Sequence, residues 1–106
     1  MAKKETGSTA MLVLALLKEK EMYGYQIIEE LDRRSSHVFQ MKEGTLYTVL
    51  HGLEKDRLIA AREAETVKGR IRRYYAVTEK GLRTLEEKKQ EWNTFSKAVT
   101  AILTGA

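Results

Sequence analysis

The sequence predicts an α+β fold that is mostly α-helical. Helical patterns occupy the chain before residue 57 and again after residue 78, whereas between residues 58 and 77 the period of the apolar residues changes to two. Proline is absent, and a composition of 42% hydrophobic and 32% charged residues is typical of an ordered, helix-rich protein. At 106 residues the chain has the length of one domain with a modest core.

The first segment predicts a buried helix rather than a secretory signal. Residues 1–8 are polar and are predicted to form a flexible tail, after which Ser8 or Thr9 can cap a helix. The run from Ala10 to Leu17 is apolar on every side, as expected for a helix covered by neighbours or by a partner chain. It is far shorter than the roughly 20 residues of a membrane span, and no small-residue cleavage site follows it. Because cysteine is also absent, we expect a protein of the reducing cytoplasm with no membrane partner.

The next segment predicts an amphipathic helix and a short extended piece. Tyr23, Ile27 and Leu31 recur every four residues among charged neighbours, and a glycine near the start of this helix permits close packing. In residues 35–42, apolar and polar side chains alternate. We therefore expect a short strand in residues 35–42, between the second and the third helix.

A third helix is predicted from residue 43 to residue 56. Its apolar side chains fall on one side when they are projected at 100° per residue: Leu46, Val49, Leu50 and Leu53. The opposite side carries no acidic residue at its centre, although an exposed helix face usually mixes both signs of charge. This second face consists of Gly44, Thr48, His51 and Lys55, flanked by Thr45, Tyr47 and Gly52.

Residues 58–65 and 70–77 predict two strands of a β-hairpin, joined by residues 66–69, where Gly69 suits a positive φ. Thr78 ends the second strand and can cap a fourth helix, which runs toward residue 104 and is about 39 Å long. This order of elements is the layout of a winged helix-turn-helix. We therefore expect a tail in residues 1–8, a winged-helix domain in residues 9–78 and a dimerisation helix in residues 79–106.

The residue types argue against an enzyme. The only histidines are His37 and His51, cysteine is absent, and the acidic residues are scattered over predicted helix surfaces. A metal site needs convergent ligands, and a nucleophile needs a base and an orienting group close by. Neither can be assembled from the local spacing, so the sequence predicts no catalytic residue, no metal and no cofactor.

Four cations fall within six positions at the hairpin, Lys68, Arg70, Arg72 and Arg73. Cations at an exposed tip suit phosphate, although a solubilising edge strand would also carry them. Together with the acid-free helix face they favour nucleic acid, with the third helix in the major groove of duplex DNA. The residues that we expect to contact DNA are Tyr25, Thr45, Tyr47, Thr48, His51, Lys55, Lys68, Arg70 and Arg72.

The last helix predicts a homodimer. From Trp92 onward its apolar residues follow the spacing three, four, three, which is the seam of a heptad repeat. A two-fold dimer presents two recognition helices to half-sites about 34 Å apart, on a near-palindromic target. The residues that we expect in the dimer contact are Leu85, Trp92, Phe95, Val99 and Ile102.

Three segments together resemble the PadR family of bacterial transcriptional regulators: "MYGYQI" at 22–27, "EGTLYTVLHGLEKDRLI" at 43–59 and "RRYYAVTEKG" at 72–81. The single C-terminal helix is similar to that of the short subfamily, whose members dimerise through this helix and the first one. The resemblance implies a repressor that releases DNA when a small effector binds. The chain departs from the family pattern at Thr48, Arg57 and Lys42, where proline, glycine and serine are usual.

Trp92 resembles the tryptophan that stacks flat aromatic drugs across the dimer pore in multidrug-sensing members of the subfamily. Its candidate neighbours in such an effector site are Leu14, Lys88 and Ser96, and Ser96 replaces the acid expected for cationic drugs. A tryptophan that only anchors the dimer seam is the simpler interpretation, because burial of an aromatic ring alone explains it. A winged helix that serves protein interaction alone also stays open as an alternative function.

Overall fold

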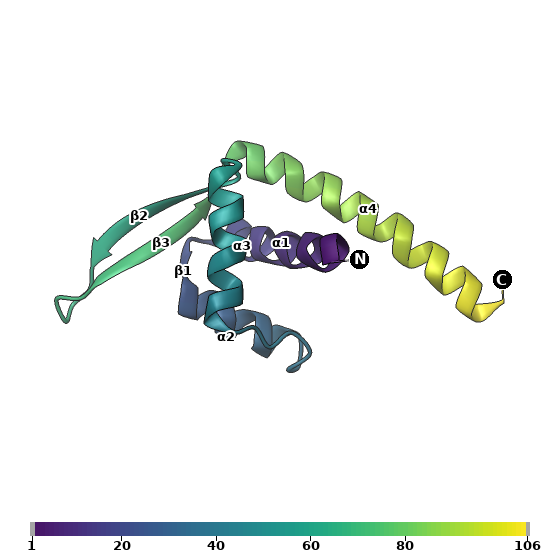
Figure 1. Ribbon diagram of the computed structural model, residues 1–106, viewed down its shortest axis with the longest axis horizontal. Helices are drawn as coiled ribbons and strands as arrows, with labels where there is room; N and C mark the ends of the chain where they lie inside the picture. The colour runs from purple at the N-terminus through teal and green to yellow at the C-terminus, as the bar shows by residue number, and fades with distance from the viewer. Residues whose placement is uncertain (1, 106) are drawn as a thin grey trace.

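The computed structural model describes the backbone of residues 2–105 and the side chains of residues 8–105. Figure 1 shows a helical body from which a β-hairpin and a long helix project in opposite directions. The prediction of a mostly helical α+β fold with a winged helix is confirmed. The elements are α1 (Ala2–Glu19), β1 (Met22–Tyr23), α2 (Gly24–Arg34), α3 (Glu43–Lys55), β2 (Ile59–Glu65), β3 (Ile71–Val77) and α4 (Glu79–Thr104).

The sheet is antiparallel, with the strand order β1-β3-β2. The hairpin of β2 and β3, hereafter the wing, agrees with the predicted strands to within one residue at each end. At its tip the Thr66 amide donates to the Arg70 carbonyl at 2.7 Å, and Gly69 takes a φ of 79° as the sequence predicted. Since β1 pairs only with Tyr74 and Tyr75, the edge of β3 is open from Arg73 toward the tip.

The short strand lies elsewhere than predicted. It was expected in residues 35–42 and is found at Met22–Tyr23 instead, immediately before α2. Ser36 and His37 both take positive φ values, 52° and 72°, so the chain turns there and cannot continue as a strand. Val38 remains 74% exposed whereas Met41 packs against the core, so the apolar residues of this loop do not share one buried face.

The start of the first helix also differs from the prediction, because α1 begins at Ala2 and passes through Ser8 and Thr9 instead of being capped by them. The predicted flexibility of residues 1–8 stays a prediction, since the side chains of residues 1–7 lie outside the described set. The apolar run of α1 from Ala10 to Leu17 is buried or partly buried as expected, with Val13 and Leu14 both 0% exposed.

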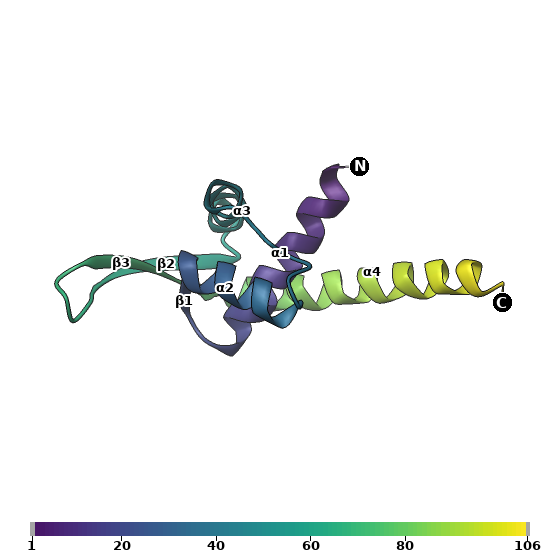
Figure 2. The same cartoon turned by 90° about the horizontal axis from the view of Figure 1, so that it is seen from below.

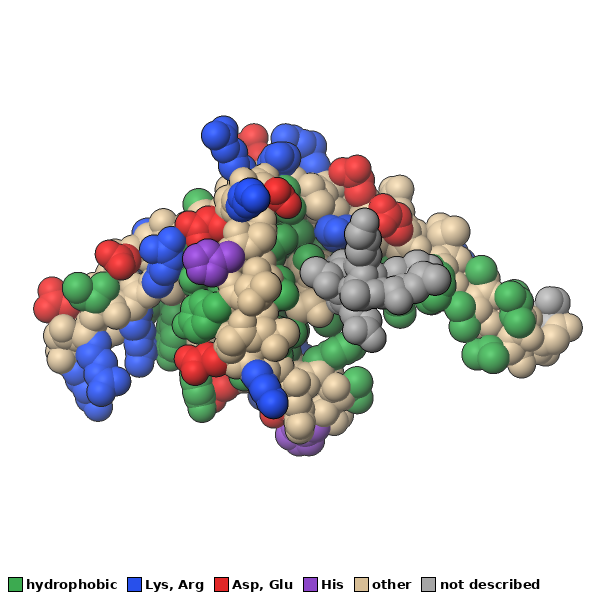
Figure 3. All heavy atoms as spheres, in the orientation of Figure 1, with side chains coloured by type: hydrophobic (Ala, Val, Ile, Leu, Met, Phe, Trp, Pro, Cys, Tyr) green, Lys and Arg blue, Asp and Glu red, His purple; other side chains and the backbone are tan. Residues whose placement is uncertain are grey.

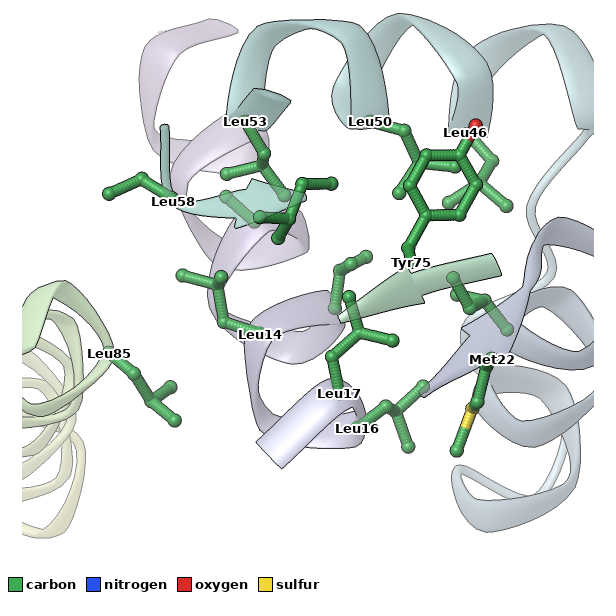
Figure 4. Packing of buried hydrophobic residues seen from close by; sticks show 14 of the residues in the cluster. Leu14, Leu16, Leu17, Met22, Leu46, Leu50, Leu53, Leu58, Tyr75 and Leu85 are labelled. Carbon is green, nitrogen blue, oxygen red and sulfur yellow. The ribbon is translucent and has the colours of Figure 1, made fainter. Parts of the chain in front are cut away.

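The core surrounds α1. Figure 4 shows α1 at the centre, with α3 and α4 on two sides of it and Tyr75 extending from β3 toward Leu46 and Leu50. This packing confirms that the apolar side of α3 faces inward. The buried apolar residues are Ala10, Val13, Leu14, Leu16, Leu17, Met22, Ile27, Leu31, Leu46, Leu50, Leu53, Leu58, Ile59, Tyr75 and Leu85.

Helix α4 starts as predicted and then leaves the body. The Thr78 hydroxyl accepts from the Gly81 amide at 3.0 Å, and it donates to the Arg57 carbonyl at 2.8 Å. Leu85, in the second turn, is the last residue of α4 in the buried core. Beyond it the helix extends away from the other elements, as both views show (Figures 1 and 2). Within the described part of the chain, no helix has the length and apolarity needed to cross a bilayer.

Candidate nucleic-acid interface

The outward face of α3 is exposed over its whole length. Leu46, Leu50 and Leu53 turn into the core, which leaves the opposite side of the helix to solvent. Figure 3 shows the middle of this face as an uncharged strip with charged side chains around it. The residues predicted for this face are all exposed: Gly44, Thr45, Tyr47, Thr48, His51, Gly52 and Lys55.

The two helices of the helix-turn-helix touch through a tyrosine and a glycine. A Cβ atom at Gly24 would lie 2.8 Å from the Tyr47 hydroxyl, so only glycine lets this ring approach the start of α2. At the start of α3, the side chain of Lys42 makes no capping hydrogen bond. The Thr48 hydroxyl donates to the Gly44 carbonyl at 3.1 Å, which satisfies it within the helix.

A cleft of about 580 Å³ lies where the start of α2, the start of α3 and the open edge of β3 meet. Three phenol rings and two guanidinium groups line it, so it offers hydroxyl and cationic donors suited to phosphate oxygens. Two carboxylates complete its wall. The lining residues are Tyr23, Gly24, Tyr25, Glu29, Glu43, Tyr47, Ile71, Arg72 and Arg73.

Three arginines of the wing contact another side chain through an ion pair or an aromatic ring. Arg62 pairs with Glu21, and Arg73 pairs with Glu54 at 2.8 Å. These partners act on the charges: the hydrogen bond from Arg62 lowers the pKa of the Glu21 carboxyl, and the Glu54 charge raises the pKa of Arg73. The guanidinium carbon of Arg72 lies 4.2 Å from the centre of the Tyr23 ring, a cation–π contact.

Lys68 and Arg70 are the free cations of the wing. Both are exposed at its tip, and among the side chains that the structure describes they form no ion pair. Arg72, predicted to act with them, is instead partly buried near the cleft. The structure thus brings Tyr25, Tyr47 and Arg72 together around one cleft, and it leaves Lys68 and Arg70 apart at the far end of the hairpin.

The sequence prediction did not assign Arg73 and Glu54 to the site. The signal that could have found Arg73 is the period of two, which puts it on the same face of β3 as the inward-facing Tyr75. That face lies against α3, where an acid near the end of the helix is within reach of the guanidinium. Glu54 could not be identified as the partner of Arg73, because this pairing depends on the angle between the wing and α3, which cannot be obtained from the sequence.

The predicted effector and dimer residues fall into two groups. Leu14 is 0% exposed and Leu85 is 1% exposed, so both belong to the core of this chain and neither presents a surface to a ligand or a second copy. Trp92 is 48% exposed, and its ring centre lies 6.1 Å from that of Phe95. Exposed apolar residues continue along α4, and with Trp92 they form a surface hereafter called the distal stripe: Trp92, Phe95, Val99 and Ile102.

No cluster of three or more potential metal ligands occurs among the described residues. The exposed surface of this region consists of three features: the acid-poor face of α3, the cationic tip of the wing and the cleft between them.

Comparison with known proteins places this geometry in a family. Residues 13–87 match the family described as "Transcriptional regulator PadR-like family". The chain is 35% identical over 81 residues to Transcriptional regulator Rv3488 of Mycobacterium tuberculosis, which covers 76% of this chain and 72% of that protein.

Solved structures agree with this match. A transcriptional regulator from Clostridium thermocellum superposes with a TM-score of 0.82 at 31% identity, over 89% of this chain and 91% of that one. A PadR family transcription regulator from Clostridium difficile gives a TM-score of 0.78 at 34% identity, over 90% and 97% of the two chains. The sequence prediction of a regulator that is not an enzyme is thereby confirmed. The chain belongs to the PadR-like family of transcriptional regulators.

Proposed function

We propose that the protein is a homodimeric repressor that binds a near-palindromic operator in duplex DNA and works in the cytoplasm, where its DNA is. The observation that carries this proposal is the exposed face of α3, which has no acid at its centre and lies beside a wing with unpaired cations at its tip. A recognition helix with such a face fits the major groove, and free cations at a hairpin tip fit the phosphate backbone or the minor groove.

The residues have distinct roles in this proposal. Thr45, Thr48, His51 and Lys55 on α3 meet base edges or phosphates in the major groove. Tyr25, Tyr47 and Arg72 donate to a phosphate at the cleft, since all three line it. Lys68 and Arg70 hold the backbone at the wing tip.

The distal stripe supports the dimer. Ile102 is 80% exposed and Trp92 is 48% exposed, on the part of α4 that extends beyond the body after Leu85 (Figure 1). A heptad seam that its own chain leaves uncovered is suited to the same seam of a second copy. Two copies related by a two-fold axis present two α3 helices, which predicts the inverted repeat in the operator.

A salt titration with charge-reversed variants tests DNA binding. We expect affinity of the wild-type protein for operator duplex to fall steeply as salt rises, because each neutralised phosphate releases a counterion. Lys68→Glu/Arg70→Glu should weaken binding by at least about 100-fold, since both wings of the dimer lose two phosphate contacts. The matched control is Lys18→Glu/Lys20→Glu, which makes the same charge change at the end of α1 and the turn after it, on the side of the body away from α3 (Figure 2).

The operator itself comes from selection of bound fragments out of genomic DNA, and an inverted repeat is the expected product. If the wild-type protein binds no duplex in dilute buffer, the function is protein interaction alone. If control and wing variants lose affinity equally, net charge explains the binding and the wing has no specific role.

A second proposal concerns the effector that releases the DNA. Trp92 and Phe95 present two neighbouring, half-exposed rings, which suit a planar aromatic molecule held between two copies of α4. Since Trp92 is the only tryptophan, its fluorescence reports this site alone. We expect quenching by planar aromatic compounds together with release of DNA. A diverse panel of such compounds that leaves the fluorescence unchanged would contradict the proposal and leave Trp92 as a packing residue.

A further inference from the structure

Two arginine–glutamate pairs join the wing to the body, one on each face of the hairpin. Arg62 lies opposite Tyr74 in the β2–β3 ladder, and Arg73 lies opposite Glu63. Adjacent rungs of a ladder point to opposite faces, so the two arginines face in opposite directions. Arg62 meets Glu21, which precedes β1, whereas Arg73 meets Glu54 in the last turn of α3.

The Arg73–Glu54 pair fills the angle between the recognition helix and the wing. Its N–O distance is 2.8 Å, and its side chains are 49% and 32% exposed, so both groups are accessible from solvent. Basic, acidic and histidine side chains lie together between α3 and the hairpin on the face that Figure 3 shows. The pair therefore lies at the surface beside the last turn of α3, which contains Glu54.

In B-form DNA, a single sugar–phosphate strand separates the major groove from the neighbouring minor groove. A protein that places α3 in the first groove and a wing on the second must straddle that strand. The strand then crosses the angle between α3 and β3. The side chain of Arg73 places its guanidinium group in this angle. A carboxylate and a phosphate each offer a guanidinium group a pair of acceptor oxygens in equivalent positions.

Resting on the DNA-binding function proposed above, we propose that Glu54 occupies the place of a DNA phosphate in the free protein, and that Arg73 exchanges Glu54 for a phosphate oxygen when DNA binds. Glu54 is then a specificity-determining residue. In each subunit, Glu54 keeps the Arg73 guanidinium paired, so this cation is not available to an approaching duplex. The Glu54 carboxylate also repels the phosphate strand. Operator DNA overcomes this resistance through contacts with α3 that other sequences lack.

The partly exposed position of the pair fits an exchange. A deeply buried pair would hold its partners permanently, whereas an accessible one can open without exposing any core residue. The electrostatic attraction of Glu54 also raises the pKa of Arg73, so the guanidinium stays charged and ready for either anion.

The test measures affinity for operator and for random duplex as a function of salt, with four variants whose folding is checked by thermal unfolding. Glu54→Gln should tighten binding to random duplex by about three- to tenfold, because Arg73 is released and a repulsive charge is gone. Arg73→Gln should weaken binding by about tenfold and reduce the salt slope by about one per subunit. In the Arg73→Gln background, the gain from Glu54→Gln should shrink to less than about twofold, since the gain acts through Arg73.

The matched control is Glu21→Gln, which removes one acid and breaks the other wing pair, on the face away from α3. It should change affinity by less than about twofold. Weaker binding by Glu54→Gln would mean that the acid only orients the wing, and an equal gain in both arginine backgrounds would mean plain repulsion; either result overturns the exchange. Wild-type protein that binds no duplex at all would instead overturn the proposed function.

Discussion

The body of the protein and the end of α4 both carry apolar residues at helical spacing but use them differently. In the body, Leu14, Leu46 and Leu50 are at most 1% exposed, because α1 packs against α2, α3, α4 and β3. Beyond Leu85, Val99 is 36% exposed and Ile102 is 80% exposed. A helical period alone therefore does not distinguish a residue that packs within its own chain from one that is completed by another chain. The difference comes from where the neighbouring elements end.

The largest expected effect comes from crowding the point where α4 joins the body. A Cβ atom at Gly81 would lie 2.1 Å from the Leu58 carbonyl oxygen and 2.7 Å from a Val77 methyl carbon. Since backbone cannot yield as a flexible side chain does, Gly81→Ala should lower the free energy of unfolding by about 3 kcal/mol or more. Urea unfolding followed by circular dichroism measures this loss.

The control for this substitution is Gly52→Ala, because a Cβ atom there would have no atom within 4 Å apart from its chain neighbours and the nearby backbone of its own helix. Alanine is the better helix former, so this variant should be more stable than wild type by about 0.5–1 kcal/mol. If both variants lose stability alike, the close contact at Gly81 is not what fixes α4 to the body.

The second prediction tests whether the end of α4 serves the contact between two copies and contributes nothing to the fold of the body. Val99→Glu/Ile102→Glu should weaken self-association by at least about 100-fold, because each copy would bury two unpaired charges in the seam. The helical content should persist, since neither residue contributes to the core of the chain. Sedimentation equilibrium measures the subunit association. Gln90→Glu/Ala101→Glu adds the same charge on the opposite side of α4 and should leave the association unchanged.

The elements of the body were predictable wherever one face of a segment is buried. Leu46, Leu50 and Leu53 recur at helical spacing, and the structure buries all three. The position of β1 was not predictable, because two residues are too few to show a period and their pairing depends on β3, some 50 residues later. Likewise, the exposed Val38 shows that alternation in a short segment does not establish a strand.

Of the candidate site, the chemistry could be predicted better than the geometry. The exposed face of α3 and the free cations Lys68 and Arg70 were evident from residue types and spacing. The stacking of Arg72 on Tyr23 and the pairing of Arg73 with Glu54 were not, because both depend on how the wing is set against the body. The buried position of Leu85 was also missed, since the spacing of α4 does not show where it leaves the core.

The third prediction is a gain in stability at the turn between α3 and the wing, smaller in size than the loss expected for Gly81→Ala. Arg57 takes a φ of 62°, a left-handed conformation that glycine adopts without the steric cost of a Cβ atom. Arg57→Gly should therefore raise the free energy of unfolding by about 1 kcal/mol. Arg57→Ala keeps the Cβ atom and should bring no such gain. Thermal unfolding of the two variants checks the difference, and an equal gain in both would assign the effect to the lost charge.

The smallest expected effect is a loss of stability of the body at low pH. The carboxyl groups whose pKa is lowered include Glu19 and Glu30, through hydrogen bonds from Arg34 to the first and from Arg33 and Arg34 to the second. A carboxyl whose pKa is lower in the folded than in the unfolded chain stabilises the fold above its unfolded pKa, near 4.5. That contribution is lost as the pH falls through the lower, folded pKa.

Because Arg34 connects Glu19 at the end of α1 to Glu30 on α2, acid should loosen the packing of these two helices. Arg34→Gln should lower the urea midpoint slightly at pH 7 and leave it unchanged at a pH below the lowered folded pKa of Glu19 and Glu30, where both carboxyls are protonated in either protein. Arg83→Gln, on the exposed side of α4, serves as the control at both pH values. A difference between Arg34→Gln and wild type that persists unchanged at the lower pH would show that the stem of Arg34 contributes through packing, and its charge would then have no part in joining α1 to α2.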